Sequence, residues 1–158
     1  MNMEGHPCMS HKSDEWATPQ ALYDRLNKKF DFQLDPCCTE ENMKAPIGIG
    51  LPRDGLAADW SYHKRVFVNP PYSQVAKWVQ KAYEESRKGC IVVCLVKSCT
   101  DTKWWHEYAM KADVIIFLQG RVKFGGATTG APFPSCILVF KNNCPAQPVQ
   151  IRTMKVKA

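Results

Sequence analysis

The second half of the chain alternates apolar runs of strand length with segments of helical periodicity. The runs 90–96, 113–119 and 135–140 are apolar almost throughout, which is typical of strands buried on both faces. Residues 73–89 place apolar side chains at helical spacing, and residues 102–111 predict a second, shorter helix. This alternation predicts an α/β domain with a doubly wound, mostly parallel sheet. The last two strands have no helix between them, so we expect the C-terminal strand to be antiparallel.

The first half has weaker patterns. Thr18 followed by Pro19 is typical of a helix start, and the apolar spacing predicts a helix over 18–29. Residues 30–35 alternate and predict a strand. Residues 37–58, with several glycines and prolines, predict a loop. The apolar segment 65–68 predicts a short strand that stops at Asn69.

Size and charge set outer limits. A chain of 158 residues is long enough for one domain. The net charge is +6, and the end of the chain contributes to it through Lys141, Arg152, Lys155 and Lys157 without a single acid. A basic tail over 142–158 fits either a nucleic-acid partner or a solvated chain end. The polar residues 1–15 are expected to be flexible.

No apolar run approaches the roughly 20 residues of a membrane span, and the first residues lack the apolar core of a secretory signal. A cytoplasmic location is therefore expected, without a membrane partner. Cys90, Cys94 and Cys136 lie in apolar strand runs, so reduced, buried thiols are expected rather than disulfides. The N-terminal cluster of His6, Cys8 and His11 has no evident fourth ligand, and we expect no metal.

Asn69, Pro70, Pro71 and Tyr72 follow directly after a predicted buried strand. Ligands of doubly wound sheets bind at the carboxyl ends of strands, which directs attention to Asp35, Asn69 and Lys97. The sequence NPPY could simply be a rigid turn. Alternatively, a stiff loop could aim the Asn69 oxygen and the Pro70 carbonyl at one –NH2 group, with Tyr72 beside a planar ring. The strand-end position favours the second interpretation.

Other short segments accompany NPPY in a fixed order. They are WATP at 16–19, LDP at 34–36, DGL at 54–56 with Trp60, TDT at 100–102 with Trp104 and Trp105, GRVKF at 120–124 and PFPS at 132–135. With this set, the sequence resembles the amino-methyltransferases that use S-adenosylmethionine, and more closely the phage-type DNA N6-adenine methyltransferases of the Dam group. The resemblance covers residues 15 to 140.

The resemblance implies a Rossmann-like methyltransferase domain over 16–141 that transfers a methyl group from S-adenosylmethionine to N6 of adenine in double-stranded DNA. It implies a phage or prophage protein in a bacterial host cell. The residues that match catalytic positions are Asn69, Pro70, Pro71 and Tyr72. The residues that match cofactor-binding positions are Trp16, Thr18 and Pro19, which close over the cofactor, Asp35, Pro36 and Cys37 beside its methionine half, and Asp54 at its adenine amino group.

One departure concerns the cofactor pocket. Methyltransferases at large usually place glycines after the strand that ends at Asp35, whereas this chain has none before Gly48. Only 18 residues, positions 36 to 53, separate Asp35 from Asp54, which is too few for a full helix and strand. The pocket is therefore expected to be abbreviated or to be built differently.

The mechanism implied is direct transfer without a covalent enzyme intermediate. Acceptors at Asn69 and at the Pro70 carbonyl would favour a pyramidal N6 with a free lone pair. The base would be flipped out of the duplex and stack on Tyr72. Phe124 could cover its opposite face or could equally be a loop-anchoring aromatic.

DNA contacts are predicted for residues near strand carboxyl ends, namely Lys97, Lys103, Arg121 and Lys123, although each could also be a solvated surface charge. Two other functions remain open: a non-catalytic DNA-binding module of the same fold, and the same chemistry on RNA or on glutamine in proteins. The target site and the oligomeric state are not predicted.

Overall fold

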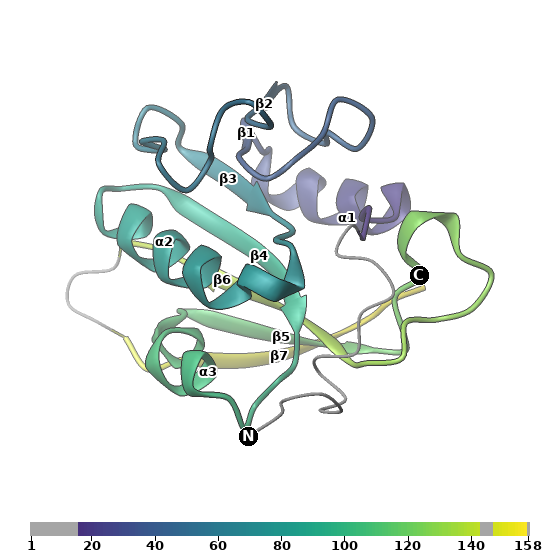
Figure 1. Cartoon of the computed structure of the whole chain (residues 1–158). Helices are drawn as coiled ribbons and strands as arrows, with labels where there is room; N and C mark the ends of the chain where they lie inside the picture. The colour runs from purple at the N-terminus through teal and green to yellow at the C-terminus, as the bar shows by residue number, and fades with distance from the viewer. Residues whose placement is uncertain (1–15, 143–146, 158) are drawn as a thin grey trace, which may run out of the picture.

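The computed structural model describes residues 16–142 and 147–157. These form one seven-stranded sheet with the order β2-β1-β3-β4-β6-β5-β7. The helix α1 (Gln20–Phe30) covers one face, and α2 (Val75–Arg87) and α3 (Lys103–Glu107) cover the other (Figure 1). The strands are β1 (Leu34–Asp35), β2 (Ile47–Gly48), β3 (Arg65–Val68), β4 (Ile91–Lys97), β5 (Val114–Gln119), β6 (Ser135–Phe140) and β7 (Gln150–Lys155).

The predicted α/β class and the mostly parallel sheet are confirmed. Strands β1 to β5 and β7 run in one direction, and β6 lies antiparallel between β4 and β5. The predicted antiparallel pairing of the runs 113–119 and 135–140 is therefore correct. As a result, the carboxyl ends of six strands meet at one edge of the sheet, where residues that follow β1, β3, β4, β5 and β7 can form a common site.

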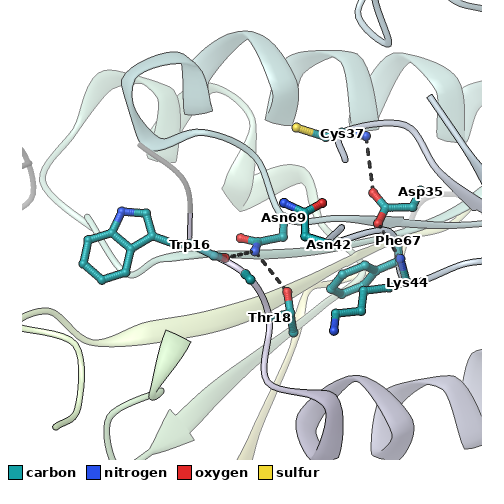
Figure 2. A pocket seen from close by; sticks show the side chains of 9 residues that line it. Trp16, Thr18, Asp35, Cys37, Asn42, Lys44, Phe67 and Asn69 are labelled. Atoms are coloured by element: carbon teal, nitrogen blue, oxygen red, sulfur yellow. Dashed lines mark hydrogen bonds between the residues drawn. The ribbon is translucent and has the colours of Figure 1, made fainter. Parts of the chain in front are cut away.

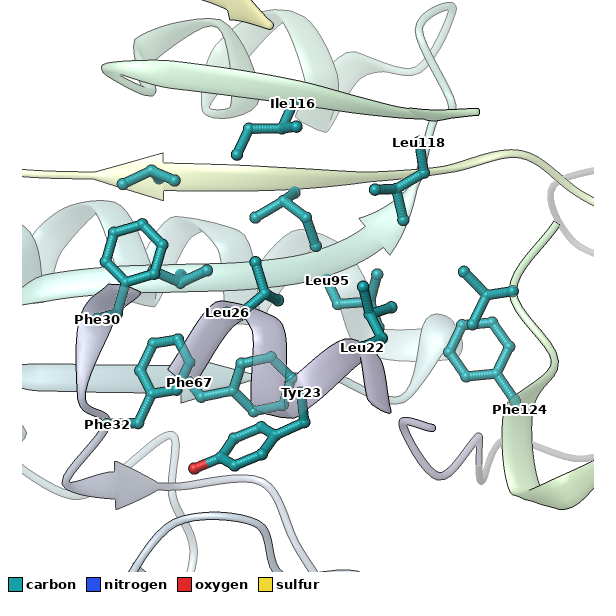
Figure 3. Packing of buried hydrophobic residues seen from close by; sticks show 14 of the residues in the cluster. Leu22, Tyr23, Leu26, Phe30, Phe32, Phe67, Leu95, Ile116, Leu118 and Phe124 are labelled. Atoms are coloured by element: carbon teal, nitrogen blue, oxygen red, sulfur yellow. The ribbon is translucent and has the colours of Figure 1, made fainter. Parts of the chain in front are cut away.

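The apolar strands supply two cores, one on each face. In β4, Val93 and Leu95 pack on the side of α1, whereas the alternate residues Val92, Cys94 and Val96 pack on the side of α2 and α3. The first of these cores includes the α1 side chains Tyr23 and Phe30 together with Phe32 and Phe67, which are labelled in Figure 3. Burial on both faces explains why these strands read as continuous apolar runs.

Several predicted boundaries shift for local reasons. The first helix begins at Gln20 rather than at residue 18, because the Thr18 side chain bonds Asn69 instead of capping the helix. The helix ends at Phe30, and the next residue, Asp31, has a left-handed φ of 53°. The strand predicted over 30–35 therefore shortens to Leu34–Asp35. The loop predicted over 37–58 contains the short strand β2.

The helix predicted from Ser73 begins at Val75, after a 3-10 turn over Tyr72–Gln74. The one predicted over 102–111 divides into α3 and a 3-10 turn at Ala109–Lys111.

The predicted basic tail is wrong for residues 150–155, which form β7. This strand pairs in parallel with β5 along its whole length. Its C-terminal end is held by Arg25 of α1, whose Nη1 donates to the carbonyl oxygens of Lys155 at 2.7 Å and Val156 at 3.1 Å. Since β7 is an edge strand with mostly exposed side chains, it lacks the apolar pattern from which a strand is predicted. The sheet thus continues past the domain boundary predicted at residue 141.

The prediction of reduced cysteines holds for five described residues and fails for one. Cys37, Cys38, Cys90, Cys94 and Cys136 are in no disulfide bond, but Cys99 is disulfide-bonded. The part of the chain that the structure describes contains no group of three metal-ligating side chains and no helix long and apolar enough to cross a membrane. The cluster of His6, Cys8 and His11, like the predicted flexible segment 1–15, lies outside the described residues.

Candidate active site

Asn69 lies at the carboxyl end of β3, and its carboxamide is held at one end only. Its Nδ2 donates to the Trp16 carbonyl and, at 3.0 Å, to Oγ1 of Thr18 (Figure 2). Its Oδ1 is buried and has no hydrogen-bond partner. A buried acceptor without a donor is costly in a folded protein, and such exceptions indicate a place where a ligand donor can bind.

Asp35, at the end of β1, faces the same small cavity as Asn69, Trp16 and Thr18. Its carboxylate accepts the backbone N–H of Cys37 at 3.3 Å and that of Lys44 at 3.1 Å. The side chain is only 3% exposed, and this burial raises the pKa of Asp35 to about 6 despite the two donors. A cation next to this carboxylate would favour its ionised form.

Asn69 also lines a larger cleft of about 810 Å³. Its walls come from the segments 36–43 and 48–56 and from the loop and helix after β3. Among the predicted site residues it is lined by Pro36, Cys37, Asp54, Asn69 and Pro71. Its volume falls in the range of cofactor sites, so one ligand could extend from Asp54 to Asn69.

The cleft is abbreviated, as the spacing predicted. The chain passes from β1 to the parallel strand β2 through a turn instead of a full helix. Close approach is provided by glycines of the opposite segment: a Cβ atom at Gly50 would collide with the Cys38 carbonyl, and one at Gly55 with the Pro36 carbonyl. These glycines follow β2 rather than β1, and they let the two segments that line the cleft pack closely against each other.

The Asp54 segment is anchored from below by buried polar contacts. The Trp60 indole is fully buried, and its Nε1 donates to the Gly55 carbonyl at 2.9 Å. The backbone N–H of Trp60 donates in turn to Glu85 of α2 at 3.0 Å, and the Glu85 carboxylate is paired with Lys81 at 2.6 Å and with Lys88. These hydrogen bonds hold the 54–56 turn against α2.

Tyr72 is buried in an aromatic cluster, which we define as Trp16, Tyr72, Phe124 and Phe133. Ring centroids within it lie 5.1 to 6.3 Å apart. The Tyr72 side chain is only 5% exposed, so no base can stack on it in this conformation. Phe124 is also buried and matches the alternative interpretation of a loop-anchoring aromatic.

Lys97 does not lie on the rim where a phosphate contact was predicted. It is 2% exposed, because β4 turns its side chain into the core beneath the aromatic cluster. Its Nζ lies 4.6 Å from the centroid of Tyr72 and 4.2 Å from that of Phe133. This cation–π geometry places the charge under the candidate base site, away from the surface.

Three other predicted DNA contacts, Lys103, Arg121 and Lys123, are exposed at the carboxyl edge. The end of β7 reaches the same edge, since Val156 donates to the carbonyl of Gln119 at 3.0 Å, and it brings Lys155 and Lys157 with it. Figure 1 shows this chain end beside the loop that follows β5.

Two further predicted residues lie close to Asn69 in the sequence or at the start of α1. Pro19 accepts the first backbone bonds of α1, from Leu22 and Tyr23, and Pro70 is buried.

Sequence reasoning missed several lining residues. Asn42, Lys44 and Phe67 line the small cavity, and Trp78 lines the cleft. Phe67 lies two residues before Asn69 in the same strand, where alternation could have indicated it. Asn42 and Lys44 reach the cavity only through the turn between β1 and β2, for which the sequence offers no signal.

The sequence profile of the family described as DNA N-6-adenine-methyltransferase (Dam) matches residues 7–155. The chain belongs to this family. The match covers all seven strands of the sheet, from β1 to β7.

One curated relative is the DNA N-6-adenine-methyltransferase of Escherichia phage T1, which is 28% identical over 107 residues. These residues are 67% of this chain and 45% of the relative, so the chain spans about half the length of the curated relative that it matches. Among solved structures, one described as a class I S-adenosylmethionine-dependent methyltransferase from Listeria monocytogenes has a TM-score of 0.54 at 12% identity. It covers 95% of this chain and 68% of its own, and this likeness confirms the fold class.

Proposed function

We propose that this Dam family chain transfers a methyl group from S-adenosylmethionine to N6 of adenine in DNA. The observation that supports the proposal most is the Asn69 carboxamide. Its nitrogen is already bonded within the protein, while its oxygen is buried, unpartnered and able to accept an N–H. An exocyclic amino group supplies that donor, and its nitrogen is the atom to be methylated.

The residues of the cleft fit S-adenosylmethionine. Asp54 at one end could accept from an adenine amino group, and the buried carboxylate of Asp35 could pair with the ammonium of the methionine half. When bound, this group supplies a methyl carbon on a cationic sulfur, and the electron pair of the broken C–S bond stays on that sulfur.

In the proposed reaction, Asn69 Oδ1 and the Pro70 carbonyl accept hydrogen bonds from the two N6–H groups. This favours a pyramidal nitrogen whose lone pair can form the new bond to the methyl carbon. The methylated nitrogen then releases one proton to water. Burial raises the pKa of Tyr72 far above its usual range, so its hydroxyl stays neutral and takes no part in this proton transfer.

The target base would have to leave the duplex, because N6 is otherwise inside the base stack. It can reach Tyr72 only if one of the covering side chains moves. Trp16 is half-buried and is bonded to Asn69 through its backbone carbonyl alone, so its indole is the group that we expect to swing aside. The exposed Arg121, Lys123 and Lys155 at this edge would contact phosphates.

The deciding experiment measures transfer from labelled S-adenosylmethionine to unmethylated DNA, RNA and protein, followed by digestion to nucleosides or amino acids. We expect label in N6-methyladenine of DNA. Asn69→Ala should lower kcat by at least about 100-fold, as loss of a preorganised acceptor does. Folded protein that binds DNA but transfers no label would favour the non-catalytic DNA-binding module, and label in RNA or in methylglutamine would identify the other substrates.

A further inference from the structure

The orientation of the Asn69 carboxamide depends on the segment 16–18. The Trp16 carbonyl can only accept a hydrogen bond, so the carboxamide atom that faces it must be the nitrogen. The second amide N–H points to Oγ1 of Thr18 at 3.0 Å. With both protons of the nitrogen engaged, the oxygen has to point the other way, which is where it is found without a partner.

The segment is itself held on both sides. The Ala17 carbonyl accepts the backbone N–H of Gly125 at 2.9 Å, and the Pro19 carbonyl accepts the N–H groups of Leu22 and Tyr23, both at 3.1 Å. Thr18 is only 4% exposed, so its hydroxyl cannot exchange Asn69 for bulk water. The backbone of residues 16–18 is therefore held in place, and its acceptors orient the Asn69 carboxamide.

We propose that Thr18 is a positioning residue for Asn69 and not the cofactor contact that the resemblance implies; this role rests on the proposed methyl transfer. Its hydroxyl oxygen accepts the second amide proton and stops rotation of the carboxamide about its last side-chain bond. Without that acceptor, a buried N–H is left unpaired, and the carboxamide gains by turning away from the geometry that presents Oδ1 to N6.

The two roles of Thr18 predict different kinetics. As a positioning residue, Thr18→Val lowers kcat by about 5- to 30-fold, as expected for one lost buried hydrogen bond, and leaves the KM for S-adenosylmethionine unchanged. If Thr18 instead contacts the cofactor, Thr18→Val raises the KM for S-adenosylmethionine with little change in kcat. Thr18→Ser keeps the acceptor and should restore kcat. The matched control is Ser86→Ala, which removes a buried hydroxyl bonded at 2.6 Å to a carbonyl within α2, remote from the site.

A second readout needs no activity. In the wild-type protein, both side-chain amide protons of Asn69 should exchange slowly with water by NMR, with the signals assigned from their loss in Asn69→Asp. Thr18→Val should accelerate exchange of one of them, and Thr18→Ala serves in its place if the valine variant does not fold. Fast exchange in the wild-type protein, or unchanged exchange in the variants, would overturn the positioning role. If the wild-type protein methylates nothing, the proposed function fails, while the exchange measurement still decides the role of Thr18.

Discussion

Replacing Asp35 by asparagine should stabilise the fold, and more so at pH 8 than at pH 5. Asp35 is 3% exposed, and burial raises its pKa from 3.8 to about 6. The folded chain therefore binds the proton more tightly than the unfolded chain does, and stability falls as the pH rises from about 4 through 6. The difference corresponds to about 3 kcal/mol at pH 8 and to about half of that at pH 5.

The substitution removes this cost but also removes an acceptor. Asp35 receives the N–H groups of Cys37 and Lys44 with separate oxygens, and asparagine has only one oxygen. The lost bond costs about 1 kcal/mol. The net expectation for Asp35→Asn is a gain of about 2 kcal/mol at pH 8 and of less than about 1 kcal/mol at pH 5.

Urea unfolding at both pH values and at constant ionic strength measures this difference. Asp59→Asn is the control, because Asp59 is exposed and accepts a backbone N–H from Ser61 in a similar way, while its pKa is lowered by those hydrogen bonds. An equal effect of Asp35→Asn at both pH values would show that the pKa of Asp35 is not raised in the folded protein. In the same series, affinity of the wild-type protein for S-adenosylmethionine should weaken below about pH 6, and Asp35→Asn should lose that pH dependence.

Two further predictions follow from contacts around the site. Trp60→Phe removes the hydrogen bond to the Gly55 carbonyl, so we expect the free energy of unfolding in urea to fall by about 1 to 2 kcal/mol. The KM for S-adenosylmethionine should rise while kcat stays unchanged. An unchanged KM would show that this hydrogen bond does not determine the shape of the cleft. Lys97→Met should change kcat but not the salt dependence of DNA binding, because Lys97 lies under Tyr72, whereas Lys155→Gln should reduce the slope of log K against log salt by about 1. Equal slopes for the two variants would contradict this distinction.

Much of the fold was predictable because strands that are buried on both faces are apolar along their length. The strands at 65–68, 113–119 and 135–140 were expected within a residue of their observed bounds, since their apolar runs reflect two covered faces. The position of Asn69 at a strand end followed from the same pattern. β7 was missed because an edge strand with mostly exposed side chains lacks this apolar pattern.

The candidate site was predictable only in part. Asn69, Asp35 and Asp54 were indicated by their positions after β1 and β3 or by resemblance. Asp35 lines the small cavity, Asp54 lines the cleft, and Asn69 lines both. Lys97 was expected on the surface, but alternation along β4 turns it inward beneath Tyr72. Charge alone indicates solvent exposure, and the aromatic neighbours that make burial tolerable come from elsewhere in the chain.

Local sequence patterns are sufficient for the class of fold, the edge of the sheet where a site must lie and the chemical groups available there. These depend on periodicity and on residue types, which are local properties. The arrangement of those groups depends on tertiary contacts: the Trp16 carbonyl that orients Asn69 is 53 residues away in the sequence, and the glycines that let the walls of the cleft pack together follow β2 instead of β1. Such contacts depend on where distant segments cross, and hydrogen-bond geometry at a crossing is not encoded in the pattern of either segment.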